Sequence, residues 1–205
     1  MTQDRADRRG PLQAVAREFT TVAWVLIPIG IGLNVVGGML VNVLRLPLFL
    51  DAIGTILVAV LAGPWVGAAT GGLTNLILGL VTVPTMLPYA LTNIAIGLVA
   101  GYMARAGWFR TVPKVAVTGI AIMVAAIIVS APITAYLFGG VTGTGTDVVR
   151  AFFLATGRTI IEAVLLESLI SESVDKLISV FVAFALARSI PQRYRPENAH
   201  HTLPA

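Results

Sequence analysis

The stretch LDAIGTILVAVLAGPWVGAATGGLTNLILGL, residues 50–80, leads into the longest uncharged run of the chain, which begins just after Asp51. No Asp, Glu, Lys or Arg occurs from Ala52 to Ala104, a run of 53 residues. A helix of roughly 20 apolar residues crosses a bilayer core, so this run is long enough to cross more than once. Gly63-Pro64 and two later prolines interrupt it, and proline is disfavoured inside a helix. The run therefore predicts three membrane helices, at 47–62, 65–81 and 88–104.

The composition of the whole chain agrees with a membrane protein. Of its 205 residues, 57% are hydrophobic and 12% are charged, and the mean hydropathy is +0.88. Soluble domains typically carry about 25% charged residues. The chain has no cysteine, which excludes disulfides, thiolate metal sites and cysteine nucleophiles. We expect no catalytic residues, no metal site and no cofactor, and we interpret His200 and His201 as part of a polar tail.

The remaining apolar segments complete a predicted all-α bundle of six transmembrane helices. Three further spans are expected at 19–42, 114–138 and 168–188. An extra amphipathic helix is expected before the last span, because charged residues recur at helical spacing between Arg150 and Lys176. If those charges instead reach the bilayer interior, their cost makes them functional candidates. The predicted domains are an N-terminal segment 1–18, a transmembrane domain 19–190 and a tail 191–205.

The positions of the basic residues predict the orientation. Ten of the fourteen Lys and Arg residues fall on the side that would hold both termini and the loop after the fourth helix. Positive residues favour the cytoplasm, so both termini are expected to be cytoplasmic in a multi-pass protein of the cell membrane. Because the basic residues sit at span ends and not in one patch, no nucleic-acid partner is expected.

Several polar residues in the apolar segments are candidate ligand contacts. Asn34 lies in the first helix, and either a helix–helix hydrogen bond or a ligand contact explains it. Asp51 is either the N-cap of the second helix or part of a loop that covers a cavity with Arg45. Asn75, Tyr89 and Asn93 offer uncharged hydrogen-bonding groups on later helices. Small residues that allow close helix packing form a separate set: Gly30, Gly37, Gly38, Gly67 and Gly71.

Three motifs resemble the substrate-specific (S) components of energy-coupling factor (ECF) transporters, a type of ABC transporter. They are Leu46-Pro-Leu-Phe-Leu-Asp51, the turn Ala62-Gly-Pro-Trp-Val-Gly67 that leads to Gly71 and Asn75, and Glu172-Ser-Val-Asp-Lys-Leu177 with Pro191-Gln-Arg193. Members of this family are six-helix membrane proteins that capture vitamins or other micronutrients.

The resemblance implies a non-enzymatic substrate-binding subunit. It would act with a transmembrane coupling subunit and two ATPases, which fits a chain whose Gly139–Asp147 loop lacks a phosphate-binding motif. Carried onto this sequence, it implies a cavity near the outer face. The residues implied to bind substrate are Asn34, Arg45, Asp51, Asn75, Tyr89, Asn93, Arg158 and Glu162.

The sequence differs from the family pattern at the motif expected to dock on the coupling subunit. Family members often use an Ala-x-x-x-Ala pattern in the first helix, whereas here Ala23 is followed by Ile27. The glycine-rich surface from Gly30 to Gly38 is the expected substitute.

Two other classes of function remain open from the sequence. A multi-helix membrane sensor or scaffold would have a similar helical pattern, although no soluble output domain is attached. A membrane enzyme acting on lipid or isoprenoid would need paired acidic metal ligands, and the acidic residues from Glu162 to Asp175 lack an Asp-x-x-Asp spacing.

Overall fold

The regular elements of the chain are all helical. The computed structural model describes residues 15–191 and 202–203, and no strand occurs among them. Apart from the few residues within those ranges, the predicted segments 1–18 and 191–205 lie outside the described part. The α-helices are α2 (Thr21–Leu44), α3 (Ile53–Ala62), α4 (Pro64–Val81), α5 (Ala90–Arg105), α6 (Val112–Pro132), α7 (Thr146–Ala155) and α8 (Ile160–Ser189), with short helical turns η1 (Pro84–Met86) and η2 (Ile133–Leu137).

Local sequence explains where the helices begin and end. The Thr20 hydroxyl accepts a hydrogen bond from the Ala23 N–H at 3.3 Å and caps α2, which ends at Arg45 in a left-handed conformation with φ 53°. Pro64 occupies the first turn of α4, where its missing N–H is not needed. Thr159 caps α8 in a reciprocal capping box with Glu162.

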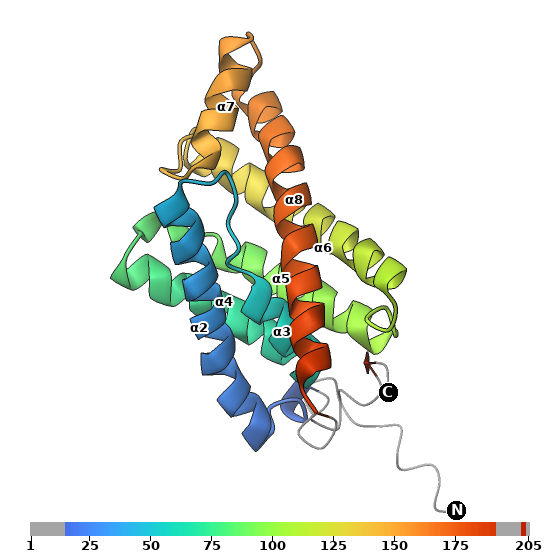
Figure 1. Cartoon of the computed structure of the whole chain (residues 1–205). Helices are drawn as coiled ribbons and strands as arrows, with labels where there is room; N and C mark the ends of the chain where they lie inside the picture. The colour runs from blue at the N-terminus through green and yellow to red at the C-terminus, as the bar shows by residue number, and fades with distance from the viewer. Residues whose placement is uncertain (1–14, 192–201, 204–205) are drawn as a thin grey trace, which may run out of the picture.

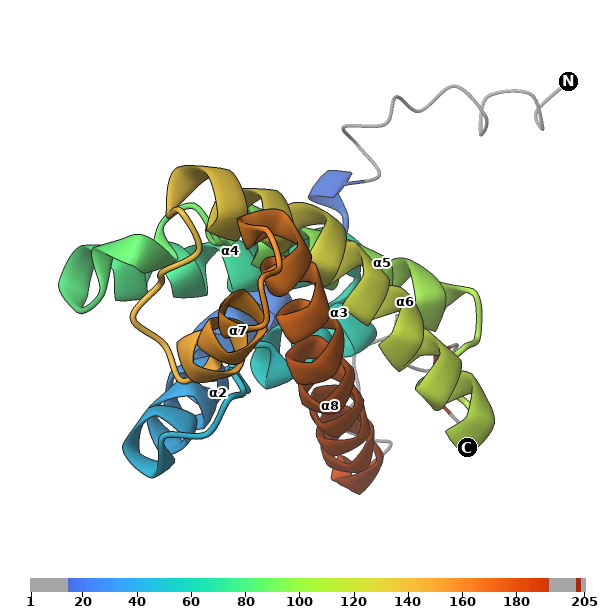
Figure 2. The same ribbon diagram turned by 90° about the horizontal axis from the view of Figure 1, so that it is seen from above.

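Helix α3 forms the centre of the bundle. It packs against α2, α4, α5 and α8, and all its residues except the first are buried. In Figure 1, α2 runs upward and α8 runs downward, with α7 at the top of the bundle. Seen from above, α7 lies between α2 and α8 (Figure 2). The start of α2 and the end of α8 therefore lie at one end, and α7 lies at the other.

Three helices are long and apolar enough to cross a membrane by length and composition, which indicates a membrane protein. Among the described residues these are Thr21–Leu44, Pro64–Val81 and Val112–Leu137. They correspond to the spans predicted at 19–42, 65–81 and 114–138. Helix α5 has 16 residues, about 24 Å at 1.5 Å per residue, which falls short of a bilayer core about 30 Å thick.

No helix spans residues 47–62, contrary to the sequence prediction. The chain is irregular up to Ala52, and α3 has only 10 residues, about 15 Å of helix. Leu50 has a φ of 47°, and its N–H group and that of Phe49 donate to the Asp175 carboxylate and not to a helix. The apolar character of α3 reflects burial by other helices.

The charged segment from Arg150 to Lys176 is not one amphipathic surface helix. Helix α7 ends at Ala155, and α8 begins at Ile160 and continues without a break to Ser189. The predicted last span at 168–188 is therefore part of a 30-residue helix. Glu167, Glu172, Asp175 and Lys176 on this helix are buried among the protein's own helices, so they do not form the polar face of a surface helix.

Close backbone contacts explain most of the predicted packing glycines. A methyl group on Gly30 would lie 2.7 Å from Val58 and Thr70 side-chain atoms, and one on Gly37 would overlap the Leu50 carbonyl oxygen. Gly30 and Gly37 are buried, so they face this protein's own helices and not a docking partner.

The remaining glycines of that set differ. A methyl group on Gly67 would overlap Ala59, and one on Gly71 would lie 2.6 Å from the Asn93 carbonyl oxygen. Gly38 has only ordinary contacts, the nearest at 3.8 Å.

Candidate functional site

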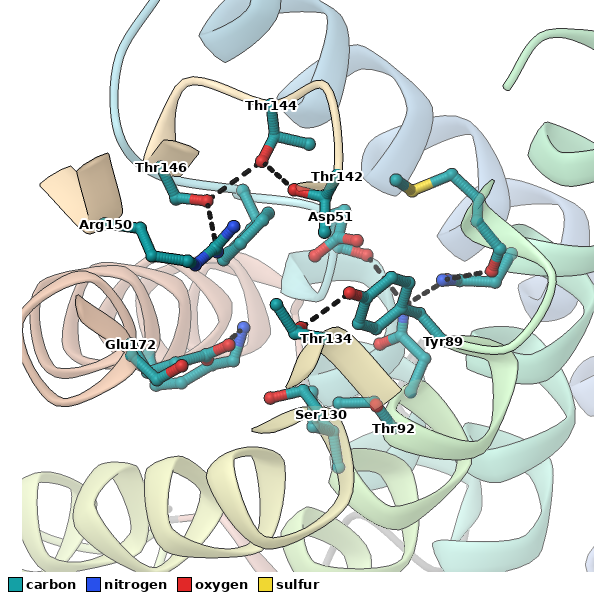
Figure 3. Close-up of a pocket in the computed structure, with 17 residues that line it drawn as sticks. Asp51, Tyr89, Thr92, Ser130, Thr134, Thr142, Thr144, Thr146, Arg150 and Glu172 are labelled. Atoms are coloured by element: carbon teal, nitrogen blue, oxygen red, sulfur yellow. Dashed lines mark hydrogen bonds and ion pairs between the residues drawn. The ribbon is translucent and has the colours of Figure 1, made fainter. Parts of the chain in front are cut away.

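A polar cavity lies beneath the loops at the α7 end of the bundle (Figure 3). It measures about 50 Å³, enough for a few water molecules. The loop before α3, helices α4, α5 and α6, the turn η2, the segment 142–150 and helix α8 all contribute to its lining. The lining residues are Phe49, Asp51, Asn75, Met86, Tyr89, Thr92, Asn93, Ile96, Ser130, Thr134, Thr142, Thr144, Thr146, Arg150, Ser168, Glu172 and Lys176.

Two asparagine amides form one wall of the cavity. The Asn93 side-chain N–H donates to Asn75 Oδ1 at 2.6 Å, and the Asn75 amide donates to the Met86 carbonyl at 3.3 Å. The Asn93 side-chain nitrogen also lies 3.5 Å from the backbone carbonyl oxygen of Asp51. Because carbonyl oxygens can only accept, they fix both amides with the nitrogen toward them. The Asn93 Oδ1 atom is consequently left buried and without a hydrogen-bond partner.

Hydroxyl groups form the opposite wall. The Tyr89 hydroxyl and Thr134 Oγ1 are 2.6 Å apart, and the Tyr89 ring stacks on Phe138 at 5.9 Å between centroids. The hydroxyls of three alternate threonines, residues 142 and 144 in the loop before α7 and residue 146 at the start of α7, form a chain with separations of 2.8 and 2.9 Å (Figure 3). This loop and Tyr89 therefore hold polar groups against the cavity.

Arg150 organises the upper end of the site. Its guanidinium contacts the carboxylates of Asp147 at 2.6 Å and Glu167 at 2.8 Å, and it donates to the Gly140 carbonyl at 2.7 Å. Arg150 and Glu167 are both buried, so this pair is screened little by water. The contacts tie the loop before α7 to helix α8.

Asp147 fastens the same loop to the start of α7. Burial alone would raise the pKa of this carboxyl group. Hydrogen bonds from the Thr142 hydroxyl and from the N–H groups of Thr142 and Gly143, with the charge of Arg150, outweigh burial and lower the pKa of Asp147 below its usual value. The carboxylate form therefore stabilises this loop.

Lys176 is the second buried cation of the site. Its Nζ atom lies 2.5 Å from Asp175 Oδ2 and 3.1 Å from Glu172 Oε2. It also lies 5.8 Å from the centre of the Phe49 ring. Asp175 in turn accepts the Phe49 and Leu50 N–H groups at 3.0 and 2.7 Å. The loop before α3 is thus anchored to the middle of α8.

A wider groove adjoins the cavity. It measures about 560 Å³ and lies between the second half of α2, the end of α4 and the loops at this end of the bundle. The residues that line both spaces are Phe49, Asp51, Met86 and Thr144. These four residues therefore border both spaces.

The structure brings four of the eight predicted substrate-binding residues together at the cavity. These are Asp51, Asn75, Tyr89 and Asn93. Asp51 is not a helix cap, because Ala52 occupies the N-cap of α3. Arg45 lines the groove and not the cavity.

The other three predicted residues lie elsewhere. The Asn34 amide N–H donates to the Thr55 and Thr74 hydroxyls at 2.9 and 3.0 Å, and its Oδ1 accepts the Gly54 N–H at 2.7 Å, so Asn34 joins three helices. Arg158 is exposed between α7 and α8, and Glu162 is exposed in the capping box of α8.

The sequence did not reveal the roles of Thr142, Thr144 and Thr146 or of Arg150, and it indicated Lys176 only as one member of a group of charged candidates. The threonines lie in a bent segment that leads into α7, with Gly143 at a φ of 78°, so their alternation was not a signal for a shared face. Glu167 and Glu172 had been recognised only as members of a charged helix. Their helical spacing with Lys176 did not reveal which side faced the protein interior.

The fold and the site define an all-helical protein with three potential membrane spans and a small cavity with mainly polar lining residues at one end. Comparison with protein-family models, with curated proteins and with solved structures finds no match. Among residues 15–191 and 202–203, no group of three or more His, Cys, Asp and Glu side chains could hold a metal ion.

Proposed function

We propose that this protein is the substrate-binding membrane subunit of an ECF-type ATP-driven importer. The observation that carries the proposal is the cavity, which is lined mainly by polar side chains, some of whose hydrogen-bonding atoms have no partner. Buried polar groups without partners are costly, and a bound small molecule would satisfy them.

In this proposal the helices α2 to α6 and α8 lie in the bilayer. Helices α2, α4 and α6 cross it, α8 crosses it with about 45 Å of helix, and α3 and α5 are held inside the bundle. Both termini face the cytoplasm, and the cavity end faces outward. Lys and Arg counts from the sequence support that orientation.

Substrate entry requires movement in the proposed mechanism. Ligand pockets for small molecules usually measure about 300–1,000 Å³, well above the closed cavity. Displacement of the residues shared with the groove, Phe49, Met86 and Thr144 among them, would join the two spaces. A vitamin-like micronutrient could then enter from the groove.

Delivery to the cytoplasm would use a coupling subunit and two ATPases. Gly30 and Gly37 face inward, so the exposed apolar side of α2 replaces them as the proposed docking surface. Its exposed members include Trp24, Ile29 and Val36. Apolar side chains can pack against a partner helix within the bilayer.

Co-purification tests the proposal directly. The full-length tagged chain is extracted from its native membrane in mild detergent, and the proteins that remain bound are identified. We expect a transmembrane coupling subunit and two ATPases. Trp24→Arg is expected to release them, whereas Val124→Arg, a similar change on exposed α6, should retain them. Recovery of the chain without these subunits, or with a signalling protein in their place, would contradict the importer proposal.

A further inference from the structure

The charged groups around the cavity are unbalanced in favour of carboxylates. Each of the two cations contacts two carboxylates, and Lys176 also attracts the Asp51 carboxylate electrostatically without forming an ion pair with it. Of the five carboxylates only Asp51 and Glu172 line the cavity, and no side chain of residues 15–191 or 202–203 donates a hydrogen bond to Asp51. The four ion pairs are Arg150 with Asp147 and Glu167, and Lys176 with Glu172 and Asp175.

Two residues that line the same space carry oxygen atoms without a hydrogen-bond partner. Asn93 is 2% exposed and lines the cavity, and its Oδ1 atom has no hydrogen-bond partner. The two carbonyl groups that hold the Asn75 and Asn93 amides prevent this oxygen from exchanging places with its nitrogen. Thr92, also buried and part of the lining, has a hydroxyl without a partner. These observations are independent of the charge imbalance.

We infer that the cavity binds a small organic cation with several N–H donors, such as a protonated amine or amidine. The inference rests on the proposed function, because it names the substrate class for the same cavity. The positive charge would lie beside the Asp51 carboxylate, and N–H groups would donate to Asn93 Oδ1 and the Thr92 hydroxyl. The Arg150 Nε–H, which also lacks a partner, offers one donor to an acceptor atom of the compound.

A cationic ligand supplies a positive charge and hydrogen-bond donors, both of which the cavity lacks. It neutralises a carboxylate in a region of low dielectric constant, where an unpaired charge is costly. It also provides hydrogens to acceptors that no protein group reaches. The five carboxylates outnumber the two cations and disfavour an anion, and a neutral isostere would leave Asp51 with only the charge of Lys176, which already contacts Glu172 and Asp175.

Three isosteric probes test the charge preference. Acetamidinium, acetamide and acetate each have four non-hydrogen atoms and a planar head, so all are small enough for the closed cavity. Each is titrated up to about 50 mM into the full chain in detergent at constant ionic strength, and binding is measured by NMR and by the midpoint of thermal unfolding. We expect acetamidinium to bind about tenfold more tightly than acetamide, with no binding of acetate.

Two variants test whether Asp51 causes the preference for a cation. Asp51→Asn keeps the size of the side chain and removes its charge, so the affinity ratio of acetamidinium to acetamide should fall about tenfold, to near unity. Glu18→Gln makes the corresponding change in a buried carboxylate that contacts Arg105 and the Trp65 N–H, remote from the cavity lining, and should leave the ratio unchanged.

Several outcomes would overturn the inference. They are equal or tighter binding of acetamide or acetate, no binding of any probe, and an unchanged ratio in Asp51→Asn. None of these outcomes decides the importer proposal, because co-purification of the coupling subunit and ATPases is measured separately.

Discussion

Asp175, in the middle of helix α8, accepts a hydrogen bond at 2.7 Å from the backbone N–H of Leu50, 125 residues earlier in the chain. The Phe49 N–H donates to the same carboxylate oxygen at 3.0 Å. One oxygen of Asp175 therefore holds the loop that borders both the cavity and the groove, while its other oxygen contacts Lys176. Closure of the cavity and the charge on α8 are physically linked.

Replacement of Asp175 should destabilise the protein. Asp175→Ala removes the acceptor of two N–H groups and one partner of buried Lys176, so we expect the free energy of unfolding to fall by about 3 kcal/mol. Asp175→Asn keeps an acceptor oxygen and should lose about half as much. The measurement is unfolding of the purified protein by SDS titration in mild detergent.

Arg158→Ala is the control for this measurement. Arg158 is exposed, and its replacement should change the free energy of unfolding by no more than about 0.5 kcal/mol. Equal stability of Asp175→Ala and the control would show that Asp175 does not anchor the loop.

The Arg150–Glu167 pair should behave as one unit. Arg150→Met leaves Glu167 and Asp147 without their buried cation, and we expect a loss of about 3–5 kcal/mol. Adding Glu167→Gln removes one stranded charge, so the double variant should be less destabilised than the sum of the two single variants, by about 1–3 kcal/mol. SDS titration of the wild type, the two single variants and the double variant completes this double-mutant cycle. Strictly additive losses of unfolding free energy would contradict the coupling.

Hydropathy was sufficient to predict an all-helical chain and the positions of its long apolar helices. Helices α2, α4 and α6 agree with the predicted spans because proline, glycine and charged residues mark their ends. The prediction of a span at 47–62 was wrong, since hydropathy measures exclusion from water and does not distinguish lipid from protein. Only tertiary contacts, such as that of Asp175 with Leu50, reveal that α3 is an internal helix.

The site was predicted in part for a similar reason. Asn75 and Asn93 stood out as amides in uncharged helices, and the structure places both at the cavity. Asn34 has the same chemistry but bonds to Thr55 and Thr74, partners on other helices that a single sequence does not identify. Arg150 went unnoticed because its partner Glu167 lies 17 residues away, across a helix boundary.

Helix packing at α3 should tolerate no added methyl group. Gly54→Ala would place a methyl on the Gly30 carbonyl and force α2 and α3 apart, with an expected loss of about 1–3 kcal/mol. Gly32→Ala, on the same α2 helix but with open space around it, should be neutral or slightly stabilising through helix propensity. The free energy of unfolding of both variants is measured in the same detergent. Equal changes in Gly54→Ala and Gly32→Ala would count against tight α2–α3 packing.

The loop before α7 should weaken in acid. The pKa of Asp147 is lowered in the folded protein, so its carboxylate contributes stability above the usual pKa of about 4 and loses that contribution as pH falls through the lowered value. The thermal midpoint of the wild type should therefore exceed that of Asp147→Asn at pH 7, and the difference should shrink toward pH of about 3. A difference independent of pH would exclude an ionised Asp147 as the cause.

The two ends of the molecule should be distinguishable in intact cells. The chain has no native cysteine, so single cysteines report position without a background. Thr156→Cys, exposed after α7, should react with a membrane-impermeant maleimide added outside. Ser189→Cys, exposed at the end of α8, should react only after the membrane is permeabilised. The reverse labelling would place the cavity on the cytoplasmic side, where capture of an external substrate is impossible, whereas labelling of both from outside would show that α8 does not cross the bilayer.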